Sequence, residues 1–490
     1  MLNRLSTILG IPGDHPQRLL FGGLAVVSML LIWAGIGFQA WWLMGVPAVL
    51  AVLWLTAVDF RRVFFLMIAC LPLSIETELP GGFSTDFPSE QLMWLLTLCG
   101  VGWLLRNVRA VDARFVRHPL TIGLILHLIW ISISVLTSQD VYVSLKYLLA
   151  KGWYVIVFYC LAAHLLRTEK DFKEFFWWFL IPLLIAVLSV FIRHAAINFS
   201  FQDVAYVMGP FFRNHVMYAC LLAIFLPFIW YATYWYRRWS KMWWFLVITI
   251  AFLLVAINFA YTRAAYVALA AAVGIYWIMR WRLMKMALLG FALVLGIFIT
   301  FVGTRDNWLE FAPDYEKAIT HTRFDNLLEA TTKLEDISTM ERVYRWVAAT
   351  YMIKERPITG FGPGNFYFYY TKYTVSSFKT YVSDNPEHSG IHNYYLMTAV
   401  EQGLPGMVIF ILFSVLVMLY GERVFHRSPP GWRRRMVTAS VMCFILIDLL
   451  MLMNDLVETD KIGSLFFMSV AMLVNLDLNG RMKGNTDLRD

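Results

Sequence analysis

The chain has 490 residues, of which 59% are hydrophobic and 17% aromatic, and its formal net charge at pH 7 is +8. Apolar runs of about 20 residues recur along most of its length, which excludes a soluble globular protein and indicates a polytopic helical membrane protein. The positive charge lies between these runs, so it sets the orientation in a membrane and does not indicate nucleic-acid binding. All five cysteines fall inside apolar runs, which indicates packing thiols and no disulfide framework.

Taken in chain order, the apolar runs predict an all-α fold with about 14 transmembrane helices, within a range of about 12–14. No small-residue cleavage site follows the first run, so this span is expected to stay uncleaved. The predicted parts are residues 1–303 with spans 1–11, a large polar loop at 304–403, and residues 404–490 with the last spans and a cytoplasmic tail. The expected spans are 19–37, 40–58, 63–75, 89–106, 119–137, 146–166, 173–195, 214–236, 242–261, 264–280, 284–303, 404–424, 436–456 and 461–478.

Lysine and arginine gather in alternate connections, and the side that carries them is predicted to be cytoplasmic, with both termini on it. The large loop falls on the opposite side and is predicted to be extracytoplasmic. The basic connections contain Arg61 and Arg62; Arg106, Arg109, Arg114 and Arg117; Arg167, Lys170 and Lys173; Arg237, Arg238 and Lys241; Arg280, Arg282 and Lys285; and Arg433, Arg434 and Arg435.

Several charged residues outside the large loop have a structural explanation beside a functional one. Lys146 and Lys151 lie near the outer end of the sixth span, where snorkelling to the interface explains them more simply than anion binding. Asp448, inside the thirteenth span, should be paired or protonated. A solvated acidic hairpin is favoured over a catalytic role for the group around a Pro-Gly-Gly turn, which comprises Glu76, Glu78, Asp86 and Glu90.

Two arginines lie where the chain enters spans on the outer side. Arg213 precedes the eighth span, as either an interfacial arginine or an anion ligand, and His215 beside it is favoured as a hydrogen-bonded core histidine. Arg263 lies between two apolar runs with no polar loop to hold it, so its guanidinium must stay at the membrane boundary or inside the bundle. A functional role is therefore favoured for Arg263 over a plain interfacial one.

The large loop is predicted to be partly helical. Residues 314–334 are charged and predicted to be helical, and the capping-box pattern of Ser338 and Glu341 predicts a second helix at about 339–355. On that helix one face carries three large side chains, at i, i+3 and i+4: Arg342, Arg345 and Trp346.

Pro357 is predicted to end this helix, and three alternating glycines then predict a tight loop: Gly360, Gly362 and Gly364. A phosphate cradle for a nucleotide is a weak alternative, because no strand precedes the glycines and no Lys-Ser/Thr helix follows them. A bend that brings the backbone close to an active site is favoured. The Tyr-rich stretch after it is predicted to be irregular.

His388 and His392 are four residues apart, a spacing that would suggest a zinc site if both lay on one helix. Gly390 argues against a continuous helix, and no Cys or Glu-x-x-His partner lies nearby, so a metal is disfavoured. If helical, residues 392–402 would span only about 16 Å, which is too short to cross a bilayer.

His392 is therefore predicted to begin a short helix that dips toward the membrane face. Glu401 lies near the end of that helix, and Gly403 and Pro405 break it before the next span.

Two of these patterns resemble the O-antigen ligase and O-antigen polymerase superfamily. The pattern Arg342-x3-Trp346 fits the family's R-x3-L/W motif. The family's second motif, H-[NSQ]-x9-G-x-x-G, fits His392-Asn393 followed by nine residues and then Gly403-Leu-Pro-Gly406. The GFGPGNF run at 360–366 is similar to the segment between them, and Thr-Arg at 262–263 resembles the start of the family domain. The resemblance covers roughly residues 245–425 and implies a GT-C-like fold with one large helical periplasmic loop.

The resemblance implies transfer of a glycan from an undecaprenyl-diphosphate carrier to an acceptor hydroxyl, on the periplasmic face of the bacterial inner membrane. In a ligase the acceptor is lipid A-core. The implied partners are this donor, the acceptor and the lipid bilayer, without nucleic acid, cofactor or metal.

The residue types suit this chemistry. A diphosphate favours planar, permanently charged, bidentate donors, so Arg263 and Arg342, with Arg213 and Arg345, are the candidate ligands. A sugar hydroxyl needs a base, and His392 is the candidate, because nearby arginines would lower its pKa and keep it neutral. Direct attack on the anomeric carbon would invert its configuration. The supporting residues are Asn393, Glu401, Gly403 and Gly406.

Other functions remain open. A repeat-unit polymerase and a protein O-oligosaccharyltransferase would hold the same donor, and the ligase is preferred only because its second motif is complete. Met407-Val408-Ile409 stand where ligases often have Thr and Trp, which leaves the acceptor open. A transporter or flippase is the alternative of another class. It is disfavoured because no inverted repeat or matching pair of broken spans is visible, and because a transporter has no need of the large loop.

Overall fold

The computed structural model describes residues 26–34, 45–79, 83–107, 112–303, 337–375 and 389–486, with a few single positions between them. Two compact units divide the chain, residues 1–66 and residues 67–490. All candidate site residues belong to the second unit. The predicted helix at 314–334 lies outside the described residues.

In the first unit, residues 26–34 of the first predicted span are helical, and α3 (Val46–Val58) occupies the second. Asp59 separates α3 from α4 (Phe60–Leu73). Its carboxylate accepts the N–H of Arg61 at 3.1 Å and pairs with the Arg62 guanidinium at 3.1 Å, so it orients the chain where α4 begins.

The helices of the second unit lie close to the predicted spans. α8 (Val141–Tyr154) continues through a π-helix, η3 (Val155–Leu161), into α9 (Ala162–Leu165). α19 (Trp432–Leu450) is shorter than the predicted span 436–456, so Asp455 follows the helix instead of lying within it. The other long helices are α5 (Ser89–Arg106), α7 (Pro119–Leu136), α10 (Glu169–Ala196), α11 (His215–Ala232), α12 (Lys241–Phe259), α13 (Arg263–Arg280), α14 (Met284–Gly303), α18 (Tyr394–Arg427) and α20 (Asp460–Thr486).

Within the described residues, eight helices are long and apolar enough to cross a membrane, and the protein is an all-α polytopic membrane protein. Other helices at predicted spans, such as α3 and α13, are shorter or less apolar. The predicted total of about 14 spans therefore stays a prediction.

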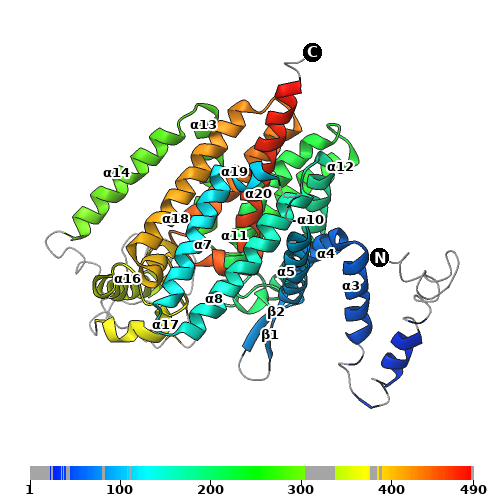
Figure 1. Cartoon of the computed structure of the whole chain (residues 1–490), viewed down its shortest axis with the longest axis horizontal. Coiled ribbons are helices and arrows are strands. Elements are labelled where there is room, and N and C mark those ends of the chain that lie inside the picture. The colour runs from blue at the N-terminus through cyan, green and yellow to red at the C-terminus, as the bar shows by residue number, and fades with distance from the viewer. Residues whose placement is uncertain are drawn as a thin grey trace. The chain divides into compact units, whose positions relative to one another are not determined.

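α11 and α20 form the centre of the second unit, because 83% and 89% of the residues in their apolar stretches are buried. α19 packs against both of them and against α18. At the other extreme, only 6% of α14 is buried, and Figure 1 shows it at the side of the helices.

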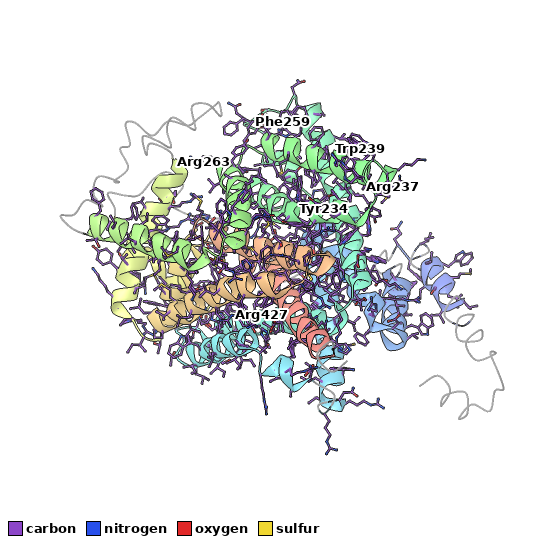
Figure 2. All side chains as sticks on the ribbon, turned by 90° about the horizontal axis from the view of Figure 1, so that it is seen from above. Tyr234, Arg237, Trp239, Phe259, Arg263 and Arg427 are labelled. Carbon is purple, nitrogen blue, oxygen red and sulfur yellow. The ribbon has the colours of Figure 1, made fainter. Side chains whose placement is uncertain are left out.

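Successive long helices run in alternating directions, so the connections of the second unit gather at two ends. Among the described residues, the loop end contains 74–79, 83–88, 137–140, 197–214, 337–375, 389–393 and 451–459. Contacts join these segments: Gln139 N–H donates to Phe361 O, and Arg213 pairs with Glu76. The basic end contains the opposite connections, where Arg435 Nη1 donates to Tyr234 O. Figure 2 shows the side chains from above and labels Tyr234, Arg237 and Arg427.

An antiparallel hairpin projects at the loop end, formed by β1 (Ile75–Leu79) and β2 (Phe83–Phe87), with Glu76 opposite Asp86 (Figure 1). The sequence predicted this hairpin, but its residues are not all in contact with solvent as expected. Ser89 at its base is buried and donates to Asp460 Oδ2 at 2.6 Å. Burial, together with the charge of Asp460, raises the pKa of Asp86 to about 7.

Candidate active site

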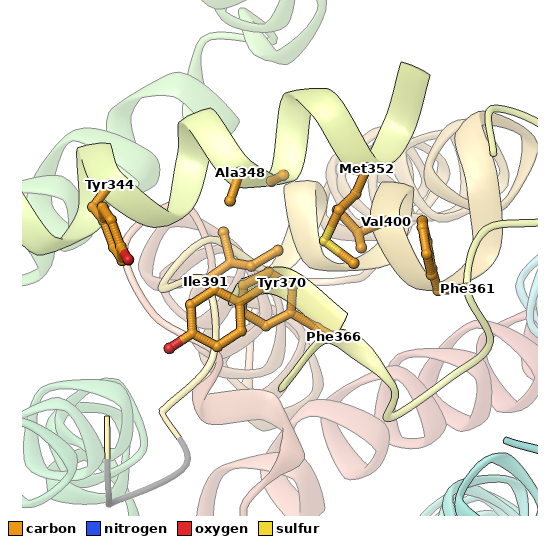
Figure 3. Packing of buried hydrophobic residues seen from close by; sticks show 9 residues of the cluster. Tyr344, Ala348, Met352, Phe361, Phe366, Tyr370, Ile391 and Val400 are labelled. Carbon is orange, nitrogen blue, oxygen red and sulfur yellow. The ribbon is translucent and has the colours of Figure 1, made fainter. Parts of the chain in front are cut away.

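α16 (Ile337–Glu355) is the platform of the site and occupies the predicted helix at about 339–355. Its apolar face packs into a core under the helix (Figure 3). Large side chains that are buried in this way stabilise the fold by about 1.5–3 kcal/mol each. The core therefore holds the chain before His392 against α16. Its members are Tyr344, Ala348, Ala349, Met352, Phe361, Phe366, Tyr370, Ile391 and Val400.

The next face of α16 fixes the backbone just before His392. Arg345 Nη1 donates to Gly390 O at 2.9 Å, and Trp346 Nε1 donates to Ile391 O at 3.1 Å. The predicted shared face of Arg345 and Trp346 therefore has a definite use, which is to bind two successive carbonyl groups. Arg345 also pairs with Glu341 at 3.5 Å, and both side chains are buried.

His392 has a left-handed backbone conformation, with φ +58°, which a non-glycine residue adopts only when its surroundings hold it there. Its N–H donates to Asp455 Oδ2 at 3.1 Å, and the N–H of Tyr394, two residues later, donates to Met451 O at 2.8 Å, at the start of the same segment. A Cβ on Gly390 would collide with the Asp455 carboxylate, so this position requires glycine. The short segment 451–459 thus supports the loop in addition to α16.

Asn393, not His392, is the N-cap of α18, because its Oδ1 accepts the N–H of Leu396 at 3.0 Å. The predicted short helix therefore begins at Tyr394, two residues later than expected. The cap uses the side chain of Asn393, one of the predicted supporting residues.

The charges around His392 favour its neutral form. Burial lowers the pKa of His392 to about 4, and the positive charges of Arg345 and Arg342 act in the same direction. Burial raises the pKa of Asp455 to about 6, although the N–H bond from His392 opposes the rise. At neutral pH the His392 ring is therefore uncharged and able to accept a proton.

The glycine-rich loop closes on the first part of α18. Phe361 N–H donates to Val400 O at 2.9 Å, and Gly362 N–H donates to Glu401 O at 2.8 Å. Gly360 and Gly362 have positive φ, and a Cβ at either position would collide with neighbouring atoms, so the predicted tight loop needs both. The Tyr-rich stretch after it is not irregular as expected but forms α17 (Phe366–Tyr369) and a 3-10 helix, η7 (Tyr370–Tyr373).

Glu401 serves this loop and lies away from solvent. Its Oε1 accepts the N–H of Phe366, the first residue of α17, at 3.3 Å. Asn365 ties the same loop to the membrane helices through Ser138 Oγ at 2.7 Å and Ser144 Oγ at 3.0 Å. Glu401 therefore supports the backbone of the glycine-rich loop, and its role as a supporting residue of the site stays a prediction.

Gly403 of the G-x-x-G motif breaks α18 with a kink, as its Gly-x-Pro sequence predicts, and helical structure resumes beyond it. Gly403 has φ +74° and ψ 173°, and a Cβ there would overlap the Ile358 carbonyl group. The bend lets Leu404 N–H donate to Pro357 O at 2.8 Å. Gly406, one turn later, lets α18 pack closely on Trp130 of α7, whose Nε1 donates to Gln402 O at 2.8 Å.

The candidate arginines belong to different elements. Arg342 and Arg345 lie close enough to His392 for their charges to act on it. Arg213 belongs to the hairpin region, where its exposed guanidinium pairs with Glu76 at 2.8 Å. Arg263 is half-buried at the start of α13, next to Thr262, whose Oγ1 donates to His215 O.

Comparison with known families agrees with this geometry. Residues 248–411, from α12 to the second half of α18, match the family described as O-Antigen ligase. The chain carries a domain of the O-antigen ligase/polymerase superfamily. The match includes Arg263, α16, the glycine loop, His392 and the G-x-x-G bend. A search of curated proteins finds no match for the chain.

The domain is completed by residues outside the matched range that the sequence did not connect to it. Asp455 falls inside the expected span 436–456, and Glu458 lies just past its end. Lys151 was expected to snorkel to the interface, but its side chain is 4% exposed and pairs with Glu458 at 2.9 Å. Burial removes the Lys151 ammonium group from water, and the Glu458 carboxylate takes the place of that water. Neither carboxylate has a local sequence signal, because each meets its partner only in the folded bundle.

Asp448 in α19 is buried, as its place in an apolar run predicts, and it lies beside Tyr395 and Ser414. Among the described residues, no group of three or more His, Cys, Asp and Glu side chains could hold a metal ion. His388, the other half of the His388–His392 pair, lies outside the described residues.

Proposed function

We propose that this protein is a glycosyltransferase of the bacterial inner membrane. It transfers a glycan from an undecaprenyl-diphosphate carrier to an acceptor hydroxyl on the periplasmic side, as an O-antigen ligase with lipid A-core as acceptor. One observation carries the proposal: within the matched domain, a histidine held neutral lies next to two arginines of α16 at the loop end.

In this proposal His392 is the general base. The acceptor hydroxyl gives its proton to the neutral imidazole and attacks the anomeric carbon of the donor sugar, and the lipid diphosphate leaves with the electron pair of the broken C–O bond. A single displacement of this kind inverts the anomeric configuration. A base with a pKa below neutral is unprotonated when the acceptor arrives, so it needs no prior deprotonation.

The leaving diphosphate gains negative charge, which arginine side chains can stabilise through bidentate hydrogen bonds. Arg342 is the first candidate, because its charge already acts on His392. Arg263 is proposed to hold the diphosphate from the start of α13. For Arg345 and Arg213 the case is weaker, since Gly390 and Glu341 hold the first and Glu76 pairs with the second.

The test uses the purified protein in lipid with an undecaprenyl-diphosphate oligosaccharide and three acceptors: lipid A-core, a second lipid-linked repeat unit and an acceptor protein. A product on lipid A-core with inverted linkage supports the ligase, and it should persist in EDTA because no metal is expected. Product on either other acceptor alone assigns a polymerase or a protein O-oligosaccharyltransferase. No product with any acceptor contradicts the proposed function.

A further inference from the structure

Lys151 and Glu458 form an ion pair beside the loop that carries His392. Lys151 Nζ lies 2.9 Å from Oε1 and 3.0 Å from Oε2 of Glu458, so both carboxylate oxygens accept from it. Tyr147 OH donates to the same Oε1 at 2.9 Å, and Lys151 also lies 3.5 Å from the hydroxyl of Tyr394. The lysine is 4% exposed, whereas the glutamate is 31% exposed.

The partner of Lys151 belongs to the segment that supports His392. Residues 451–459 connect α19 to α20. They accept two hydrogen bonds from residues 392–394, at Met451 O and Asp455 Oδ2. Glu458 is three residues beyond Asp455, in the 3-10 helix η9 (Leu456–Glu458). One short segment is thus tied to α8 through Glu458 and to His392 through Asp455.

The two ties are physically coupled. The strained backbone of His392 needs restraints from its surroundings, and Asp455 supplies one of them. An ion pair removed in part from water contributes little net stability compared with apolar side chains, so we infer that this one serves to fix geometry. Moreover, a π-helix, a feature frequent at functional sites, follows Lys151 by one turn at Val155–Leu161.

We propose that Lys151 is a positioning residue for catalysis, which acts through Glu458 and segment 451–459 to hold Asp455, and thereby His392, in place. The inference rests on the proposed function and adds to it a residue of α8, far from the matched domain in sequence. Lys151 itself touches no reacting atom in this proposal.

The test measures kcat and donor KM with an undecaprenyl-diphosphate oligosaccharide and an acceptor that gives product. In Lys151→Met we expect kcat to fall about 10–100-fold, since small displacements of reacting groups have effects of this size, while donor KM stays within about twofold. Lys151→Arg should keep most of the rate. The exchange Lys151→Glu/Glu458→Lys should be faster than either single variant. Lys146→Met, an exposed lysine of the same helix, is the matched control.

Wild-type kcat in Lys151→Met overturns the proposal, and so does a raised donor KM with unchanged kcat, which would make Lys151 a donor ligand. If Lys151→Met does not accumulate in the membrane, Glu458→Gln decides instead. It keeps the shape of the more exposed partner and removes its charge, and a wild-type kcat there also overturns the proposal.

Amide exchange separates this inference from the proposed function. The His392 N–H is the donor to Asp455, so it should exchange faster in Lys151→Met than in wild type, and the amides of α11 should not change. This result is independent of any substrate. If wild type transfers no glycan, the proposed function fails and the exchange of the His392 amide still decides the positioning role.

Discussion

The loop end and the basic end of the second unit carry their charges differently. At the basic end Arg237 and Arg427 are exposed, and Arg434 lies over the Phe425 ring at 4.2 Å, a cation–π contact. At the loop end, two groups near the candidate site are held by partners distant in sequence: the His392 N–H by Asp455 and the buried Lys151 by Glu458, 63 and 307 residues away. A charge that only orients a helix in a membrane needs no fixed geometry, whereas one that takes part in a reaction does.

This contrast predicts that substitutions at the loop end act on transfer and those at the basic end do not. The largest effect is expected for His392→Ala, which should reduce the rate about 10²–10⁴-fold, or about 3–5 kcal/mol in barrier. Donor binding and accumulation in the membrane should be normal. Asn393→Ala is the neighbouring control: it loses a helix cap, at about 1 kcal/mol of stability, and should keep most of the rate. Similar rates for both variants would contradict a catalytic role of His392.

Arg342→Ala should have the next largest effect, on donor binding. Loss of charge-assisted hydrogen bonds of about 1.5–3 kcal/mol would raise the donor KM about 10–100-fold. Arg342→Lys should recover only part of the loss, because an ammonium group lacks the bidentate fork. Arg237→Ala at the basic end is the comparison and should leave KM unchanged. If the two alanine variants have the same donor KM, the difference between the two ends has no functional meaning.

Gly403→Ala should have a smaller effect, on stability. The positive φ alone makes alanine unfavourable by about 1–3 kcal/mol, and its Cβ also meets the Ile358 carbonyl group. Thermal unfolding in detergent should show a lower Tm. Gly274→Ala in α13 is the matched control, because nothing lies within 4 Å of its Cβ and alanine is the better helix former. Equal stability of the two variants would show that the bend in α18 does not require glycine.

Much of the fold could be predicted from the sequence, because the membrane imposes a local rule. A helix in lipid needs a continuous apolar run, so α5, α12, α13 and α14 could be located to within a few residues. The alternation of the two ends followed from arginine and lysine in the connections. The bend at Gly403 was also predictable, since Gly and Pro two residues apart interrupt a helix.

The site could be predicted only in part, because its decisive contacts are non-local. His392, Arg342 and the glycine loop were found through their motifs. The motif could not show that Asn393 caps α18, or that His392 has a left-handed backbone supported by Asp455. For Lys151, hydropathy suggested an interfacial lysine. The sequence could not show its ion-pair partner, because Glu458 comes only after the thirteenth predicted span.

The central claim is that the loop end keeps His392 neutral so that it can accept a proton. NMR titration of ¹³C-labelled histidine in the lipid-reconstituted protein measures this directly, with the His392→Gln variant to assign the signal. The account predicts a His392 pKa near 4, lowered by burial and by the positive charges of Arg345 and Arg342, and a rise toward the ordinary value when Arg342 is replaced by alanine. A His392 pKa at or above its ordinary value of about 6.5 would contradict it.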